Sequence, residues 1–168
     1  MKTMTTTAAL YALLASVPFL AAGPAHAQAA LSEEQARAVI APLYDALNQP
    51  AKKDVAALLA AATSPDWQSC GVNDQCLPRD RVVGGFKARG EAIPDLVWEV
   101  KDVVVAGNRA IVRGEASGTP VKPFLGLEPT GKSFKIMSID IQTIEGGKIV
   151  RSYHIEDWAA AIRQLAAK

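Results

Sequence analysis

Two residues in the carboxy-terminal part of the sequence have side chains that could carry acid-base chemistry. His154 is one of only two histidines, and Asp140 interrupts the mostly apolar run at 136–141. A carboxylate on a central strand is costly unless it is paired or hydrated. A carboxylate near a histidine orients the imidazole and makes it a better base, as proton transfer requires. A buried structural pair, or a polar strand face that meets water, is the alternative.

The turn sequence EGGK at 145–148 decides how close these two residues lie. It is typical of a β-hairpin, and a hairpin fixes which residues of its two strands face each other. A two-residue turn would place Asp140 opposite Tyr153, whereas a bulge or a longer turn would place it beside His154. In either register the side chains lie within the roughly 4.5–8 Å of direct or diagonal cross-strand neighbours.

Cys70 and Cys76 are the only cysteines, and a turn-forming sequence separates them. In an exported protein such a pair forms a disulfide that closes a small loop. The alternatives are a redox pair, which usually has the spacing C-x-x-C, and a metal site, which needs more ligands than this chain supplies. We expect the disulfide and no bound metal.

Residues 1–27 have the pattern of a cleaved secretory signal. A basic start precedes an apolar run, and the small-x-small triplet at 25–27 precedes Gln28. Pro18 and Pro24 make the run a poor membrane span, which needs roughly 20 apolar residues. We therefore expect an exported protein, periplasmic or secreted, that begins at Gln28 and has no membrane segment after cleavage.

Composition narrows the class of partner and of chemistry. The 168 residues include 18 Lys or Arg and 17 Asp or Glu, a net charge of +1, and Lys2 is the only charged residue of the expected signal. The remaining chain, 28–168, would be neutral and suits one domain. It should lack the basic stripe of nucleic-acid-binding proteins. Neither a G-x-S-x-G elbow nor a phosphate-binding or dinucleotide-binding Gly-rich loop occurs, so an enzyme with this sequence would use acid-base chemistry without a cofactor.

Helices are expected in the first half of the mature chain. Ser32 and Gln35 form a capping box, and the apolar residues after them recur with helical spacing. This pattern predicts an amphipathic helix of roughly 16 residues, which Pro42 should kink. The remaining segments are a short helix at 52–62, a loop at 64–78 that carries both cysteines, and a weak helical segment at 79–95 interrupted by Gly84 and Gly85.

Strands are expected in the second half, where apolar and polar residues alternate. A final helix should begin at Trp158, with Asp157 as its N-cap. Helices followed by an antiparallel meander predict an α+β domain, with the helices laid across one face of a curved sheet. The four expected strands are 97–106, 108–118, 132–144 and 148–157.

Short motifs in the carboxy-terminal half follow a known family pattern. They are Phe124-Leu125-Gly126, Pro129-Thr130-Gly131, Gly147-Lys148-Ile149, Asp157 and Arg163-Gln164-Leu165. Their order resembles that of the SnoaL-like polyketide cyclases, or ester cyclases, of the nuclear transport factor two-like superfamily. The first helices and the sequence at 65–67 match more loosely, so that the resemblance covers essentially all of 31–168.

The resemblance implies a cone-shaped α+β barrel. In it, a strongly curved antiparallel sheet wraps around a long first helix, and a mainly apolar pocket opens between them. Characterised members close a ring by a cofactor-free intramolecular aldol condensation, with an aspartate near the end of the last strand as acid/base and a histidine on the preceding strand. By position, His154 takes the place of the aspartate and Asp140 that of the histidine, so the pair is present with its members exchanged.

Large aromatic residues are the candidates for lining such a pocket, and core packing is their alternative role. Trp67 is the best candidate, because its loop would lie at the mouth of the cone. The full set is Tyr44, Trp67, Phe86, Trp98 and Phe124.

Three hypotheses about function follow. In the first, the domain binds a small, mostly apolar, carbonyl-bearing molecule and catalyses cyclisation, isomerisation or hydrolysis, with His154 as general base and Asp140 as its partner. In the second, the same pocket serves a non-catalytic binding or carrier domain. In the third, the domain is an interaction module. A homodimer formed through the outer face of the sheet is expected, and nucleic acid is not expected as a partner.

Overall fold

The computed structural model describes residues 30–72 and 75–167. The expected export signal at 1–27 therefore lies outside the described residues. Within the described ranges, no helix combines the length and apolar character that crossing a membrane would require.

The first helices begin at the capping residues that the sequence predicts. At the start of α1 (Glu33–Leu47), the Ser32 side chain accepts a hydrogen bond from the Gln35 backbone nitrogen, and the Gln35 side chain accepts one from the Ser32 backbone nitrogen. The helix continues through Pro42. A short 3-10 helix, η1 (Pro50–Lys52), leads to α2 (Val55–Ala62), and α4 (Trp158–Ala166) begins after the predicted N-cap Asp157.

The third helix, α3 (Arg79–Ala92), is more regular than the sequence suggests. Gly84 and Gly85 do not interrupt it, and a Cβ atom at either position would meet nothing within 4 Å. Gly90 has a packing role, since a Cβ atom there would lie 2.5 Å from the Ala51 backbone nitrogen. The missing side chain therefore lets α3 pass close to η1.

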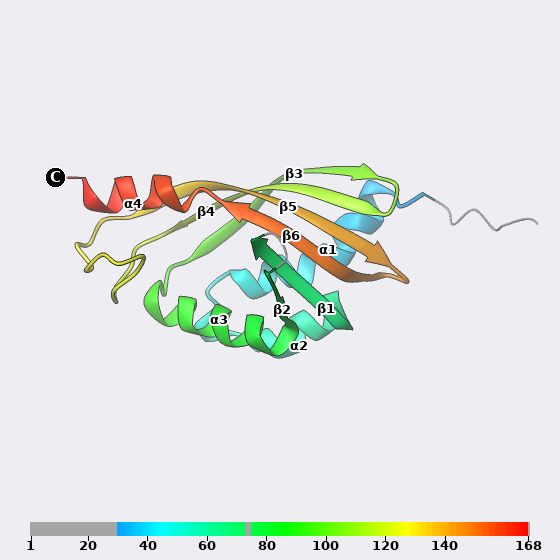
Figure 1. Ribbon diagram of the computed structural model, residues 1–168, viewed down its shortest axis with the longest axis horizontal. Helices are drawn as coiled ribbons and strands as arrows, with labels where there is room; N and C mark the ends of the chain where they lie inside the picture. The colour runs from blue at the N-terminus through cyan, green and yellow to red at the C-terminus, as the bar shows by residue number, and fades with distance from the viewer. Residues whose placement is uncertain (1–29, 73–74, 168) are drawn as a thin grey trace, which may run out of the picture.

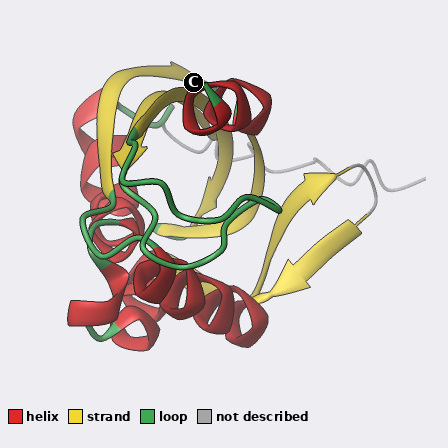
Figure 2. Ribbon diagram, turned by 90° about the vertical axis from the view of Figure 1, so that its left-hand side faces the viewer, coloured by secondary structure: helices red, strands yellow, loops and turns green. Residues whose placement is uncertain are grey.

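The four predicted strands are confirmed, and they form an antiparallel meander at one side of a six-stranded sheet with the order β2-β1-β6-β5-β4-β3. The sheet curls around the helices without closing into a barrel (Figures 1 and 2). The α+β class with a curved sheet against a long first helix is thus confirmed. The strands of the meander are β3 (Val97–Ala106), β4 (Arg109–Gly118), β5 (Phe134–Glu145) and β6 (Lys148–Glu156).

The prediction of a loop at 64–78 is wrong. This segment is a β-hairpin of β1 (Thr63–Val72) and β2 (Gln75–Pro78), closed by the predicted disulfide between Cys70 and Cys76. β1 also pairs in parallel with β6, so the sheet is mixed rather than purely antiparallel. Turn-forming residues dominate the local sequence, whereas the strand is held by a long-range pairing that local composition does not reveal.

The concave face of the sheet carries a polar strip inside an otherwise apolar core. Along β5, Ser138, Asp140 and Gln142 are buried at alternate positions, and Ser152 of β6 is buried beside Gln142. Buried polar groups of this kind need hydrogen-bond partners. The strip therefore marks the part of the core where chemistry is to be sought.

Candidate active site

A cavity of about 310 Å³ opens between the concave face of the sheet, α3 and the β1–β2 hairpin. Its walls are mostly apolar, and its titratable lining groups are Asp140, His154, Glu156, Arg89 and Arg81. A second cavity, of about 570 Å³, is lined by no titratable side chain. The first cavity is therefore the candidate active site.

Asp140 and His154 are direct cross-strand partners. A register shift between Thr143 and Ile144 interrupts the β5–β6 ladder, so the bulged register is the one present. Both side chains belong to the concave face and line the cavity. The hairpin thus brings the two predicted acid-base residues to one site.

Asp140 is a buried carboxyl group that accepts a hydrogen bond from Tyr44. Its side chain is 6% exposed, and the Tyr44 hydroxyl donates to Asp140 Oδ2 over 3.0 Å. Burial raises the pKa of Asp140 to about 6; the Tyr44 hydrogen bond opposes this rise and the negative charge of Glu156 adds to it. Burial and the charge of Asp140 also raise the pKa of Tyr44 far above its usual range. Tyr44 therefore stays protonated, while Asp140 can change its protonation state near neutral pH.

His154 is held by a different carboxylate. Its Nδ1 atom lies 2.8 Å from Glu156 Oε1, and Glu156 Oε2 accepts a hydrogen bond from Trp158 Nε1 over 3.1 Å. Burial lowers the pKa of His154, but the hydrogen bond and charge of Glu156 outweigh burial and raise it. For Glu156 the effects have the opposite sign. Burial raises its pKa, but the hydrogen bond and charge of His154 outweigh burial and lower it. With Nδ1 engaged, Nε2 is the nitrogen left for a ligand.

Gly71 of β1 lies close against this imidazole. A Cβ atom at Gly71 would lie 3.0 Å from His154 Cε1 and 3.2 Å from His154 Nε2. A side chain at this position would press on the ring. The glycine therefore leaves room for the ring in its observed position.

Glu156 is a site residue that the sequence analysis missed. Glu156, rather than Asp140, is the carboxylate that forms a hydrogen bond with His154 Nδ1. Glu156 therefore sets the tautomer of His154. The signal was available, because residues two apart on a strand share a face. A carboxylate two residues after a histidine on a strand was thus a candidate partner.

Three of the five predicted aromatic residues line the cavity, namely Trp67, Phe86 and Trp98. Trp67 lies on a strand and is 1% exposed, rather than on a loop at the mouth. Tyr44 acts behind the wall through its bond to Asp140. Phe124 does not line the cavity; it packs in an aromatic cluster, with ring centroids 6.0 Å from Phe134 and 5.6 Å from Trp158.

The described ranges contain no group of three or more His, Cys, Asp or Glu residues placed to hold a metal ion. The chemistry that the cavity offers through its own side chains is proton transfer. Asp140 and His154 supply the exchangeable protons, and apolar walls surround them.

Comparisons with known proteins agree with this architecture. Residues 43–165 match the family profile described as SnoaL-like polyketide cyclase. Among curated proteins, no sequence matches significantly.

Solved structures share the fold. A SnoaL-like protein of Jannaschia sp. CCS1 superposes with a TM-score of 0.70 at 20% identity, covering 81% of this chain and 94% of its own. TsrD of Streptomyces laurentii superposes with a TM-score of 0.70 at 24% identity, covering 82% of this chain and 99% of its own. IdmH of Streptomyces antibioticus superposes with a TM-score of 0.67 at 26% identity, covering 77% of this chain and 97% of its own.

Proposed function

The chain belongs to the SnoaL-like polyketide cyclase family, whose members bind small molecules, and we propose that it binds a small, mostly apolar, carbonyl-bearing molecule and rearranges it by cofactor-free proton transfer. One observation carries the proposal. Asp140 and His154 are direct partners on neighbouring strands, and both line one largely apolar cavity.

The proposed chemistry begins with enolisation. The step uses the form of the pair in which the shared proton sits on Asp140 and His154 is neutral: His154 Nε2 removes a proton from the carbon next to the carbonyl, and Asp140 delivers its proton to the carbonyl oxygen, which gives a neutral enol. When the carbonyl re-forms, the enol hydroxyl returns its proton to Asp140. The enol carbon either takes back the proton held by His154, or it attacks a second carbonyl, whose oxygen then takes that proton. The first outcome is proton exchange or epimerisation at that carbon, and the second is ring closure. Glu156 stabilises the imidazolium through Nδ1.

A non-catalytic binding or carrier domain is the second candidate. The observation that favours it is that Tyr44 and Glu156 already satisfy Asp140 and His154 within the protein. A satisfied buried polar network can serve rigidity alone. Both candidate functions predict the same ligand, but only the enzyme would convert it to a product.

Deuterium uptake by an apolar ketone separates them. The wild type should accelerate exchange of the carbonyl-adjacent protons of 2-tetralone in D₂O, followed by proton NMR. His154→Ala and Asp140→Asn should each lower this rate about 100-fold, while calorimetry should give affinities for 2-tetralone within about threefold of wild type. Tyr153→Phe, on the outer side of the same strand, is the matched control. Binding without acceleration in the wild type would leave the carrier role.

We also propose that the mature protein is exported and begins at Gln28. The Cys70–Cys76 disulfide supports this, because such bonds persist in oxidising compartments. The intact mass of protein recovered from outside the cytoplasm should correspond to residues 28–168 less two hydrogens. A longer chain or two free thiols would contradict the proposal.

A further inference from the structure

The cavity contains a cation that the proposed proton transfer does not use. Arg89 of α3 is half-buried and lines the cavity. Its guanidinium carbon lies 5.9 Å from the ring centre of Phe86 and 5.6 Å from that of Trp158. Among the residues at 30–72 and 75–167, no carboxylate lies within salt-bridge distance of it and no side chain or backbone oxygen accepts its hydrogen bonds.

The described surroundings give this cation no hydrogen-bonding partner of its own. Burial lowers the pKa of Arg89, and the charge of Glu156 only opposes that effect from a distance. Both carboxylate oxygens of Glu156 are committed, one to His154 and one to Trp158. Aromatic faces attract a cation. Among the described residues no fully buried side-chain nitrogen lacks a hydrogen-bond partner, so the unpartnered nitrogens of Arg89 stay open to the cavity, where a ligand can accept their hydrogen bonds.

The charges of the cavity are divided between its walls. Arg89 and Arg81, two helical turns apart on α3, line one side, and Asp140 and Glu156 line the strand side. A ligand with an anionic group at one end would therefore be oriented by its charge. The fork of a guanidinium matches a carboxylate in two parallel hydrogen bonds.

We propose that Arg89 is a specificity-determining residue that binds a carboxylate of the ligand, so that the ligand class is an apolar carbonyl compound carrying a separate carboxylic acid. The inference rests on the proposed small-molecule function and deepens it. The carboxylate lies against the Arg89 guanidinium on the α3 side of the cavity, and the reactive carbonyl lies at His154 and Asp140.

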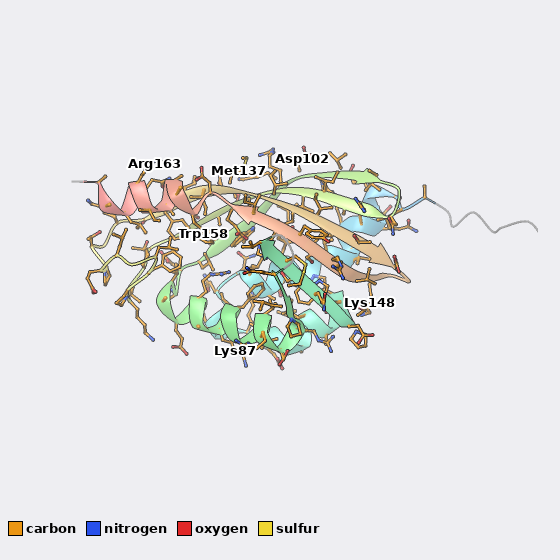
Figure 3. The ribbon with its side chains drawn as sticks, in the orientation of Figure 1. Lys87, Asp102, Met137, Lys148, Trp158 and Arg163 are labelled. Carbon is orange, nitrogen blue, oxygen red and sulfur yellow. A yellow bond between two sulfur atoms is a disulfide. The ribbon has the colours of Figure 1, made fainter. Side chains whose placement is uncertain are left out.

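Two probes with the same skeleton test the charge requirement. Isothermal calorimetry should give an affinity for 2-naphthoate about tenfold higher than for the neutral 2-naphthamide. Arg89→Met should lower the 2-naphthoate affinity about tenfold and leave that for 2-naphthamide within about threefold. Lys87→Met removes the same charge from the side of α3 that faces away from the sheet (Figure 3) and should change neither value.

Other outcomes separate this inference from the proposed function. Equal affinities in the wild type, or a preference for 2-naphthoate that survives Arg89→Met, would overturn the role of Arg89 while the pocket still binds apolar ligands. Binding of neither probe would instead contradict the small-molecule function itself. Arg89→Lys keeps the charge and should keep part of the preference. If Arg89→Met does not fold, as judged by circular dichroism, the Arg89→Lys variant and the salt dependence of wild-type 2-naphthoate binding decide.

Discussion

The pKa values of Asp140 and His154 are both raised, by different physical routes. Burial raises the pKa of the Asp140 carboxyl to about 6, whereas the hydrogen bond and charge of Glu156 raise the pKa of His154 against the effect of burial. Burial thus brings the Asp140 carboxyl towards neutral pH, where general acid-base catalysis needs it, and Glu156 favours the protonated form of His154. Each shift also changes the stability of the fold with pH.

Asp140→Asn should stabilise the protein at alkaline pH. The pKa of Asp140 rises from 3.8 to about 6 on folding, so its contribution to stability is fully present below the unfolded pKa and is lost as pH rises through 6. A shift of this size corresponds to about 3 kcal/mol. Asparagine does not ionise, and its amide oxygen can still accept from Tyr44.

Urea unfolding of both proteins at about pH 4 and pH 8 measures this effect. Asp140→Asn should gain about 2–3 kcal/mol relative to wild type between the two pH values. His154 and Glu156 titrate in both proteins, and the variant differs from wild type in the loss of the Asp140 carboxylate and of its charge effect on His154. A variant that is less stable than wild type at the higher pH would contradict the burial of a charged carboxylate.

Gly71→Ala should displace the imidazole of His154. The new Cβ atom would lie 3.0 Å from His154 Cε1, which is tighter than most packed contacts, so the ring has to shift. Proton exchange into 2-tetralone should fall about tenfold, and the NMR signals of the imidazole should move. Gly84→Ala is the control: its Cβ atom meets nothing within 4 Å, and it should stabilise α3 by about 1 kcal/mol. Unchanged imidazole signals in Gly71→Ala would rule out the contact.

The sequence could identify only part of this site, for a physical reason. A charge in an apolar strand and a lone histidine stand out locally, so Asp140 and His154 were found. Glu156 could have been predicted as well, because side chains two residues apart on a strand share a face and β6 was predicted as a strand. Arg89 is different: its helix has a weak apolar pattern, and only the packing of α3 against the sheet turns that side chain towards the cavity.

At the scale of elements, the β1–β2 hairpin forms one wall of the cavity. Gly71, Val72, Gln75 and Leu77 line it from this side. β2 is an edge strand whose only neighbour in the sheet is β1. The disulfide between Cys70 and Cys76 is the covalent tie across this pair, so it should fix the shape of the wall.

Removing the disulfide should loosen the wall more than the core. The double variant Cys70→Ser, Cys76→Ser should lose about 2 kcal/mol of stability, because the closed loop is short. Hydrogen exchange should accelerate at the β2 amides and stay unchanged in β4 and β5, and the affinity for 2-naphthamide should fall severalfold. Uniform acceleration across the sheet would show instead that the bond stabilises the whole fold.

The sequence predicted elements well where local signals fix them. Capping residues place the starts of α1 and α4, and the Gly146-Gly147 turn places the β5–β6 hairpin. The hairpin at 63–78 escaped prediction, because the parallel pairing of β1 with β6 joins segments far apart in the chain. Such pairings depend on the assembled sheet rather than on local sequence.

At the scale of the whole molecule, the two faces of the sheet have different roles. The concave face holds the cavity, while the convex face of β5 and β6 carries an apolar patch of Met137, Ile139, Ile141, Tyr153 and Ile155. Ile155 is 68% exposed and Met137 is 54% exposed. Met137 lies on the side of the sheet away from α2 and α3 (Figure 3). Exposed apolar patches of this kind mark interaction sites. We propose that two copies of the chain associate through this patch to form a homodimer.

Ile155→Lys should then convert the dimer to a monomer, because a symmetric dimer formed through this patch would bury two unpaired charges. Light scattering across a dilution series measures the change. Val121→Lys adds the same charge at an exposed position outside the patch and should leave the dimer intact. Ile155 alternates with His154 and Glu156, which face the cavity. The monomeric variant should therefore bind 2-naphthamide within about threefold of wild type, and a wild type that is monomeric throughout the series would contradict the dimer without affecting the site.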